Sequence, residues 1–215
     1  MQKDECYITL YSGKGGDGCI SFKRGRFIPK GGPNGGDGGK GGDIIFIGDR
    51  SHSDLLHLHQ SKWYAPNGLS GRGGRKNGAA GENLVIKVPL NTYVYDIDDK
   101  VLCIIKKHAQ ELCIAKGGKG GLGNTHFATA EVQAPYIRTK GIEGIEVQCK
   151  LVVKHETDVG IIGFPNSGKS SLLQYFSNAQ IKIADYPFTT LQPNLASVKY
   201  KECKTIWCDT PAITD

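Results

Sequence analysis

Short apolar segments recur up to about residue 153, and several of them alternate apolar with polar residues, as in Val147-Gln-Cys-Lys-Leu-Val. Alternation with a period of two is typical of β-strands that bury one face. No segment before residue 168 has the 3.6-residue period of a helix, so the pattern predicts a small antiparallel sandwich or barrel. The expected strands are residues 7–11, 44–47, 84–88, 92–97, 101–105, 112–115 and 146–153.

Glycine-rich blocks separate these strands, at residues 13–18, 31–42, 68–81, 117–123 and 141–144. In the second block Gly32, Gly35, Gly38 and Gly41 recur every third residue. Polyproline-II segments packed side by side need this period, because only glycine fits against a neighbouring backbone. The blocks are therefore expected to form long, ordered loops, and a set of flexible linkers is the alternative.

The pattern changes after Asp158. A buried type of strand at residues 159–164 leads into a glycine-containing turn and a helical stretch at residues 169–178. Further strands are expected at residues 195–200 and 205–208. This order predicts the opening of an α/β unit with a parallel or mixed sheet.

Composition and charge divide at the same place, so we expect a domain boundary near Thr157, with domains at residues 1–157 and 158–215. Glycine makes up 30 of the 215 residues, and 27 of these lie in residues 1–144. Residues 1–157 carry 22 Lys and Arg against 16 Asp and Glu, whereas residues 158–215 carry 5 of each. The net charge of +6 therefore belongs to the glycine-rich part.

Cysteine usage and the apolar runs indicate the compartment. The seven Cys form no C-x-x-C pair, which is typical of a reduced, cytosolic protein. The apolar runs are too short for a membrane span, and residues 1–20 lack a secretory pattern. We expect a cytoplasmic protein without a membrane partner, with an organellar matrix as the alternative location.

Residues 163–170 match the phosphate-binding pattern G-x-x-x-x-G-K-[ST] without a mismatch, as Gly163-Phe-Pro-Asn-Ser-Gly168-Lys169-Ser170. A predicted strand precedes the motif and a predicted helix follows it, which is the context of a true P-loop rather than a chance match. Backbone N–H groups of such a loop cradle the phosphates at the helix N-terminus. Lys169 is expected to reach the β- and γ-phosphates, and Ser170 to ligate Mg²⁺.

Two later features agree with a nucleotide site. A threonine pair, Thr189-Thr190, follows a proline about twenty residues after Ser170, where a loop threonine completes the Mg²⁺ shell of some P-loop proteins. The alternative is a hydroxyl-rich turn. Asp209 ends a predicted strand, where an acidic residue holds Mg²⁺ through water, although strand-end aspartates also serve as caps.

At this point the chain resembles the Obg (also called CgtA) family of ribosome-associated GTPases, over essentially its whole length. The most specific segments are residues 22–43 (FKRGRFIPKGGPNGGDGGKGGD), 115–124 (AKGGKGGLGN), 158–170 (DVGIIGFPNSGKS) and 183–194 (IADYPFTTLQPN). The resemblance implies a β plus α/β architecture. Residues 1–157 would form the glycine-rich Obg fold, a small β-barrel or sandwich with polyproline-II loops, and residue 158 would begin a P-loop GTPase domain.

The resemblance also implies the nucleotide site. Thr190 would join Ser170 on Mg²⁺, within a mobile loop at residues 188–192, and residues 209–212 would sense the γ-phosphate. The full expected set is Gly163, Phe164, Pro165, Asn166, Ser167, Gly168, Lys169, Ser170, Phe188, Thr189, Thr190, Leu191, Gln192, Asp209, Thr210, Pro211 and Ala212.

The chain departs from the family in two ways. The sensing segment reads D-x-P-G in the family, whereas Ala212 stands in the glycine's place here. A Cβ is costly if that position needs a positive φ, so impaired switching is the hypothesis. Residues 158–215 also lack the guanine-reading N-K-x-D motif, so we expect an incomplete GTPase domain, from a truncated product or a fragment. Guanine specificity follows from the resemblance alone.

The catalytic machinery is only partly visible. No glutamine follows residues 209–212, so we name no catalytic residue that would orient the attacking water. Asn166 resembles the asparagine with which potassium-stimulated relatives hold K⁺ near the phosphates, and a loop-stabilising amide is the alternative. His52, His57 and His59 are interpreted as surface or core histidines rather than a metal site, because no other ligand type completes it.

Basic residues gather around the glycine-rich blocks and suggest contacts with RNA phosphates. Phe22, Phe27, Trp63 and Tyr64 are candidates for stacking on bases, and a solvated basic face is the alternative. The family docks this domain into the large ribosomal subunit during assembly, which the resemblance extends to this chain. The candidate RNA-binding residues are Lys23, Arg24, Arg26, Lys30, Lys40, Arg72, Arg75, Lys76, Lys116 and Lys119.

The sequence therefore predicts a monomeric, Mg²⁺-dependent GTPase of Obg type that hydrolyses GTP and acts in large-subunit assembly, with GTP or GDP as ligand. A non-catalytic ribosome- or rRNA-binding module with a vestigial nucleotide site is the rival hypothesis. An ATP-using P-loop protein is a third.

Overall fold

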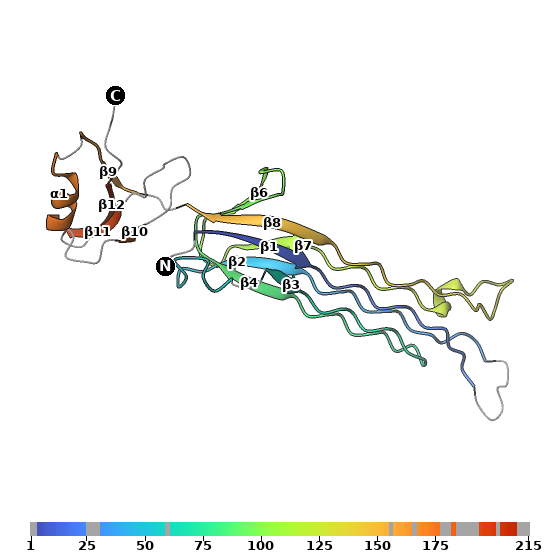
Figure 1. Ribbon diagram of the computed structural model, residues 1–215. Helices are drawn as coiled ribbons and strands as arrows, with labels where there is room; N and C mark the ends of the chain where they lie inside the picture. The colour runs from blue at the N-terminus through green and yellow to red at the C-terminus, as the bar shows by residue number, and fades with distance from the viewer. Residues whose placement is uncertain are drawn as a thin grey trace.

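A computed structural model describes residues 4–24, 31–58, 61–154, 157–164, 167–176, 182–183, 194–200 and 203–209 (Figure 1). Of the sequence-predicted site residues, Arg26, Lys30, Pro165, Asn166, residues 188–192 and residues 210–212 lie outside the described part. Within the described part, no helix is long and apolar enough to cross a membrane.

The larger sheet of the glycine-rich part has five strands in the order β3-β1-β8-β5-β6. Strand β1 pairs antiparallel with β8 along its whole length, and β8 pairs antiparallel with β5. The bounds are β1 (Glu5–Tyr11), β3 (Lys62–Tyr64), β5 (Thr92–Tyr95), β6 (Val101–Ile105) and β8 (Glu146–Val153). The long β1–β8 pair therefore holds the first and last strands of this part together.

A second sheet has three strands in the order β4-β2-β7. These are β2 (Ile44–Gly48), β4 (Leu84–Val88) and β7 (Glu111–Ala115). The expectation of antiparallel pairing is wrong for two pairs, because β1–β3 and β2–β4 are parallel. Long glycine-rich excursions connect these partners, and a long connection permits the second strand to return in the same direction as the first.

One hydrophobic core lies between the two sheets. Leu10 and Leu151 from the five-stranded sheet face Phe46 and Val88 from the three-stranded sheet, and all four are fully buried. Burial alternates along β1, where Cys6, Ile8 and Leu10 point inward and the residues between them point outward. The period of two in the sequence thus reports the two faces of the sheet.

The glycine-rich blocks continue from the strands as tracts that run side by side (Figure 1). Their backbones are cross-linked by hydrogen bonds, such as Gly16 N–H to Gly39 O (2.8 Å) and Gly41 N–H to Gly118 O (2.9 Å). A Cβ on Gly41 would lie within 3.0 Å of the Gly13 backbone carbonyl. This packing disfavours flexible linkers, and the polyproline-II conformation itself stays a prediction. One short 3₁₀ helix, η1 (Asn124–Phe127), follows the fourth block.

The described residues after 157 form a mixed sheet and one helix. The sheet order is β10-β11-β12-β9, with β12 antiparallel to β11 and parallel to β9. The bounds are β9 (Val159–Ile161), α1 (Lys169–Phe176), β10 (Lys182–Ile183), β11 (Asn194–Tyr200) and β12 (Cys203–Asp209). The expected mixed sheet is present, and strand β9 is shorter than predicted. The domain boundary near Thr157 falls between β8 and β9 and stays a prediction.

Candidate nucleotide-binding site

The P-loop motif connects β9 to α1, as the sequence predicts. Strand β9 ends at Ile161 and α1 begins at Lys169. Gly168 has a φ of +84°, a conformation that side chains with a Cβ rarely adopt. The first helical hydrogen bond runs from Leu172 N–H to Gly168 O (2.9 Å). The motif's second glycine therefore allows the turn by which the chain enters the helix.

The Lys169 ammonium group lies over the beginning of the loop. It donates hydrogen bonds to the carbonyl oxygens of Gly163 (2.9 Å) and Phe164 (2.7 Å). An ammonium group has three donors, so one N–H remains for a ligand. A positive charge held at this point by loop carbonyls is well placed for phosphate oxygens at the N-terminus of α1.

Ser170 and Asp209 meet across the site, although 39 residues separate them. The Ser170 hydroxyl donates a hydrogen bond to Asp209 Oδ2 (2.6 Å). Asp209 is the last residue of β12 and is paired with Ile161, the last residue of the parallel strand β9. The carboxylate thus lies at the carboxyl ends of two adjacent parallel strands, where α/β sheets commonly bind ligands.

The residues present fit a magnesium ion. Asp209 is 7% exposed, and its Oδ1 atom is buried without a hydrogen-bond partner among the described residues. A buried carboxylate oxygen is costly unless it is paired. Mg²⁺ prefers oxygen ligands and usually keeps several waters, which matches a serine hydroxyl with a carboxylate behind it. Ser170 would bind the ion directly, and Asp209 would accept hydrogen bonds from its waters.

Packing beneath the loop fixes its position. Leu173 of α1 is fully buried, and the Phe176 ring lies 5.6 Å from the Trp207 ring of β12. The Asp158 carboxylate accepts a hydrogen bond from Ile206 N–H (2.8 Å), which ties the beginning of β9 to β12. The strand that leads into the loop and the strand that carries Asp209 are therefore held in register.

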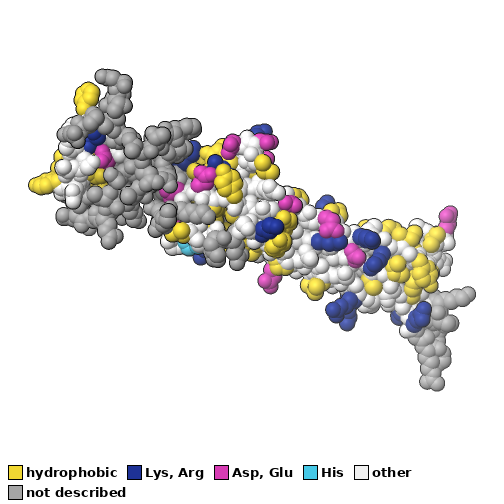
Figure 2. All heavy atoms as spheres, viewed as in Figure 1, with side chains coloured by type: hydrophobic (Ala, Val, Ile, Leu, Met, Phe, Trp, Pro, Cys, Tyr) yellow, Lys and Arg dark blue, Asp and Glu magenta, His cyan; other side chains and the backbone are white. Residues whose placement is uncertain are grey.

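The described basic candidates form two groups rather than one cluster. Lys23, Arg24, Arg72, Arg75 and Lys76 are exposed at the end of the tracts, where Arg75 N–H bonds to Asn34 O (2.7 Å). Lys116 directly follows β7, and Lys119 lies within the fourth block. Lys40 forms a salt bridge with Asp43 (2.7 Å), which neutralises part of its charge. Basic side chains also follow the glycine-rich part in Figure 2.

One aromatic candidate, Trp63, needs correction, and a second, Tyr64, lies away from the glycine-rich blocks. Trp63 packs against the hydrophobic core, so it is not free to stack on a base. Tyr64 lies on the outer face of the five-stranded sheet, stacked on Tyr11 at 4.7 Å, and not on a tract. Phe22 lies beside the second block, where it forms a β-bridge with Pro33, and its ring is 4.7 Å from the Tyr136 ring. Phe27 lies outside the described residues. Tyr136, which contacts Phe22, and the exposed Arg138 were not among the sequence-based RNA-binding candidates, because they follow no regular pattern.

The histidines have structural contacts in the described part. His57 Nε2 lies 2.7 Å from the Lys87 carbonyl oxygen, and its ring stacks on His52 at 4.1 Å. His59 lies outside the described residues. In the part of the chain that the structure describes, no group of three or more His, Cys, Asp or Glu residues is arranged to hold a metal ion.

Comparison with known families agrees with this geometry. The family model described as GTP1/OBG matches residues 3–155, which is more than half of the chain. The chain belongs to the GTP1/OBG family. A second model, described as 50S ribosome-binding GTPase, matches residues 158–215, which contain the P-loop and Asp209. The sequence-based assignment to the Obg family is confirmed.

Curated relatives in the family align over nearly the whole chain. The GTPase Obg of Chlorobaculum parvum is 47% identical over 215 residues, covering 99% of this chain and 64% of the relative. Those of Thermodesulfovibrio yellowstonii and Orientia tsutsugamushi (strain Ikeda) are 46% and 45% identical, covering 97% and 98% of this chain. The chain spans about 64% of the length of each of these relatives.

Proposed function

We propose that this chain binds a guanine nucleotide with Mg²⁺ and hydrolyses GTP, and that it acts in assembly of the large ribosomal subunit. The observation that carries the proposal is the Ser170–Asp209 hydrogen bond (2.6 Å) beside the P-loop lysine. The names of the second family model and of the relatives support the nucleotide and the ribosome. The cytoplasm is the inferred place of action.

We expect the described residues to have different roles in binding the phosphates. Lys169 would direct its third N–H toward the β- and γ-phosphate oxygens while the Gly163 and Phe164 carbonyls hold its other two. The backbone N–H groups at the beginning of α1 would bind the same oxygens. Ser170 would turn its hydroxyl oxygen from Asp209 toward the metal. Mg²⁺, when bound, supplies neutralisation of the charge on the β- and γ-phosphate oxygens.

A matched pair of serine variants tests the site. Ser170→Ala removes the hydroxyl bonded to Asp209, whereas Ser171→Ala removes an exposed hydroxyl one position further along α1. Titration with fluorescent GDP in Mg²⁺ should show about tenfold weaker binding for Ser170→Ala and no change for Ser171→Ala. Equal affinities for the two variants would reject the assigned role.

Competition between nucleotides tests which nucleotide base the site accepts. We expect GDP and GTP to displace fluorescent GDP and ATP to fail, because the relatives are named as GTPases. The N-K-x-D motif does not occur in residues 158–215, so the competition tests whether these residues select guanine without it. Displacement by ATP at similar concentrations would favour an ATP-using P-loop protein instead.

The ribosome is the proposed partner of the basic tract end. Arg72 and Arg75 lie there, exposed and adjacent to Asn34. Replacing both with Gln should weaken binding to large ribosomal subunits and reduce its salt dependence. Replacing Lys106 and Lys107 with Gln removes the same charge from the exposed β6–β7 turn and should have little effect. Equal losses in the two double variants would indicate a diffuse basic surface.

The tracts are further inferred to adopt the polyproline-II conformation around a small barrel. This inference is supported by the close packing of glycines such as Gly38 and Gly41 against neighbouring backbones. Raman optical activity should show a strong polyproline-II band that disappears with urea-induced unfolding. A spectrum with only β-sheet bands would exclude this conformation.

Ala212 favours a second candidate function, a ribosome- or rRNA-binding module without hydrolysis. The family's glycine at this position is replaced here, although Ala212 lies outside the described residues. Such a module would bind large subunits equally well with GDP, with a GTP analogue and without nucleotide. Phosphate release from GTP that depends on Lys169 would exclude it.

A further inference from the structure

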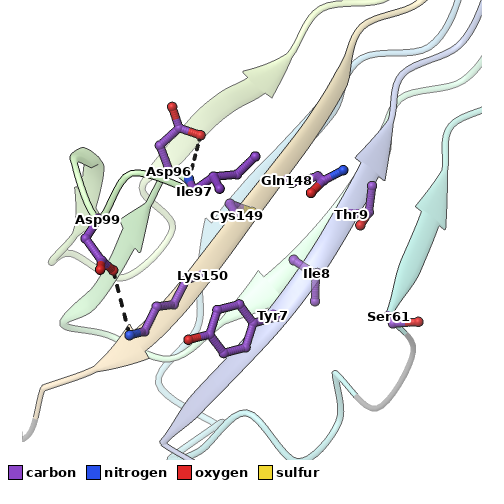
Figure 3. A pocket seen from close by; sticks show the side chains of 10 residues that line it. All are labelled: Tyr7, Ile8, Thr9, Ser61, Asp96, Ile97, Asp99, Gln148, Cys149 and Lys150. Carbon is purple, nitrogen blue, oxygen red and sulfur yellow. Dashed lines mark hydrogen bonds and ion pairs between the residues drawn. The ribbon is translucent and has the colours of Figure 1, made fainter.

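A cavity of about 320 Å³ lies on the outer face of the five-stranded sheet (Figure 3), and its described lining includes no residue of the P-loop or of the glycine tracts. Thr9 of β1 and Gln148 of β8 form its floor, and Tyr7 and Lys150 stand beside them. A cavity of this size is at the small end of ligand pockets, so it accepts one or two side chains and not a large cofactor.

The cavity walls follow from the alternation of the strands. Tyr7 and Thr9 point outward because Cys6, Ile8 and Leu10 point into the core. Their register partners on β8, Lys150 and Gln148, share that outer face. Tyr7 is 68% exposed, so a large aromatic ring is available to a partner at the edge of the cavity. Aromatic rings in this state are typical of interaction surfaces.

A cation already lies in this environment. The Lys150 ammonium is 3.2 Å from Glu5, 3.8 Å from Asp99 and 5.6 Å from the centre of the Tyr7 ring. The hydrogen bond to Glu5 raises the pKa of Lys150 above its usual value. An aromatic face with nearby carboxylates therefore stabilises a positive charge at this point of the surface.

Further negative charge lies at one end of the cavity. The turn between β5 and β6 places Asp96 and Asp99 in the wall, and Asp98 beside them. Neither Asp96 nor Asp98 has a salt bridge within the described part of the chain. Among the described residues that line the wall, Lys150 is the single cation beside two carboxylates, so this lining is acidic, whereas the chain as a whole has a net charge of +6.

We propose that this cavity docks a basic, extended segment of a partner protein, which places an arginine or lysine side chain beside Lys150, against the Tyr7 ring and within reach of the Asp96–Asp99 turn. The cationic head would pair with the carboxylates while its aliphatic stem lies along the Tyr7 ring. Arginine suits the site better, because its planar group stacks on an aromatic ring and binds carboxylates with two hydrogen bonds. Thr9 and Gln148 offer hydrogen bonds to the segment's backbone.

Charge decides against nucleic acid as the occupant. A base would stack on Tyr7, but the phosphates next to it would approach Asp96 and Asp99, which repel them. The exposed basic residues of the tracts lie outside this cavity. The proposed docking site contains no P-loop residue, so it is tested separately from nucleotide binding.

Amide chemical shifts of the ¹⁵N-labelled chain test the proposal. Three probes are titrated: the peptide Gly-Ser-Arg-Gly-Arg-Ser, its counterpart with Glu for Arg, and a thymidine hexanucleotide. We expect saturable shifts at Thr9 and Gln148 with the arginine peptide alone. Shifts at these two residues with the oligonucleotide would identify a nucleic-acid surface, and shifts with the glutamate peptide would show that charge does not select the ligand. Either result would overturn the proposal, and so would the absence of chemical-shift changes with all three probes.

A matched set of variants assigns the carboxylates. Asp96→Asn keeps the oxygen that accepts the Ile97 N–H bond (2.8 Å), and Asp99→Asn suits a φ of +54°. The double variant should bind the arginine peptide about fivefold more weakly. Asp98→Asn removes one charge, as each single cavity variant does, from the same turn outside the cavity and should change affinity less than about twofold. Equal weakening by Asp98→Asn and by either cavity variant would overturn the assignment.

Discussion

The glycine tracts and the P-loop both depend on glycine, but for different physical reasons. In the tracts, glycines such as Gly41 leave room for a neighbouring backbone, and the hydrogen bonds run from one main chain to another. In the P-loop, Gly168 supplies a positive φ, and a Cβ there would meet open space. Glycine thus permits close packing of neighbouring backbone segments in the tracts, and a left-handed backbone conformation in the P-loop.

The two regions also differ in where their side chains act. In the tracts, Asp17 and Asp43 accept hydrogen bonds from the N–H groups of Gly141 (2.9 Å) and Gly117 (2.7 Å), so side chains support the backbone. In the P-loop region the decisive bond joins two side chains, Ser170 and Asp209. The tracts are therefore held together through their backbones, whereas the P-loop region brings together polar side chains from separate elements.

The largest expected effect comes from filling the space between tracts. Gly41→Ala places a Cβ against the Gly13 carbonyl and should lower the free energy of unfolding by about 2–3 kcal/mol. Gly32→Ala is the matched control, because a Cβ there has no heavy atom within 4 Å, and it should change stability by less than about 0.5 kcal/mol. Urea unfolding measures both. Equal stability of the two variants would show that the tracts are not closely packed.

In the P-loop the same substitution acts through conformation. Gly168→Ala forces a Cβ into a φ of +84° and should cost about 1–2 kcal/mol, which appears as weaker GDP binding. Gly160→Ala, in the preceding strand, has open space around its Cβ and lies outside the loop, so GDP affinity should stay unchanged. A loss of affinity in Gly160→Ala similar to that in Gly168→Ala would contradict a role for backbone conformation.

Acid should weaken the tracts through their aspartates. The hydrogen bond from Gly141 N–H lowers the pKa of Asp17, and the bond from Lys40, followed by that from Gly117 N–H, lowers the pKa of Asp43. A lowered folded-state pKa gives stability that is present above the ordinary value of 3.8 and is lost as pH falls through the folded-state value.

Urea unfolding across this pH range should therefore show stability falling below about pH 4. Combining Asp17→Asn with Asp43→Asn should flatten that fall, whereas Asp98→Asn, in the β5–β6 turn outside the tracts, should leave it unchanged. A pH dependence equally steep in the double variant would show that other groups are responsible.

The smallest effect is expected at residues 209–212, to which the family resemblance assigns γ-phosphate sensing. If the family's glycine needs a positive φ there, Ala212→Gly should raise affinity for a GTP analogue about threefold relative to GDP. Competition against fluorescent GDP measures the ratio in both proteins. The same ratio of GTP-analogue affinity to GDP affinity in both proteins would reject the hypothesis that Ala212 impairs switching.

Much of the fold could be predicted because burial repeats along the chain. The strands β4, β6 and β8 have the predicted bounds, and α1 begins at Lys169 as expected. Strand β3 was missed because three residues are too few to show a period. The parallel direction of β2 and β4 was missed because alternation reports which face is buried, not the direction of the partner strand.

The site was predictable in its parts but not in its assembly. The sequence identified Lys169, Ser170 and Asp209 separately, each from a local pattern. Their contact depends on the register of β9 with β12, which no local pattern reports. Trp63 was misassigned for a related reason, because an aromatic residue near basic blocks has the same sequence pattern whether it faces solvent or the core.

The cross-linking of the tracts has a consequence for the kinetics of folding. Gly15 N–H bonds to Ile142 O (2.9 Å), and Gly41 N–H to Gly118 O, so the first tract is completed by residues near the end of the glycine-rich part. Contacts between residues so far apart in sequence slow folding, because the loops between them must close first. During synthesis, the first tract cannot be secured until residues 141–145 have left the ribosome.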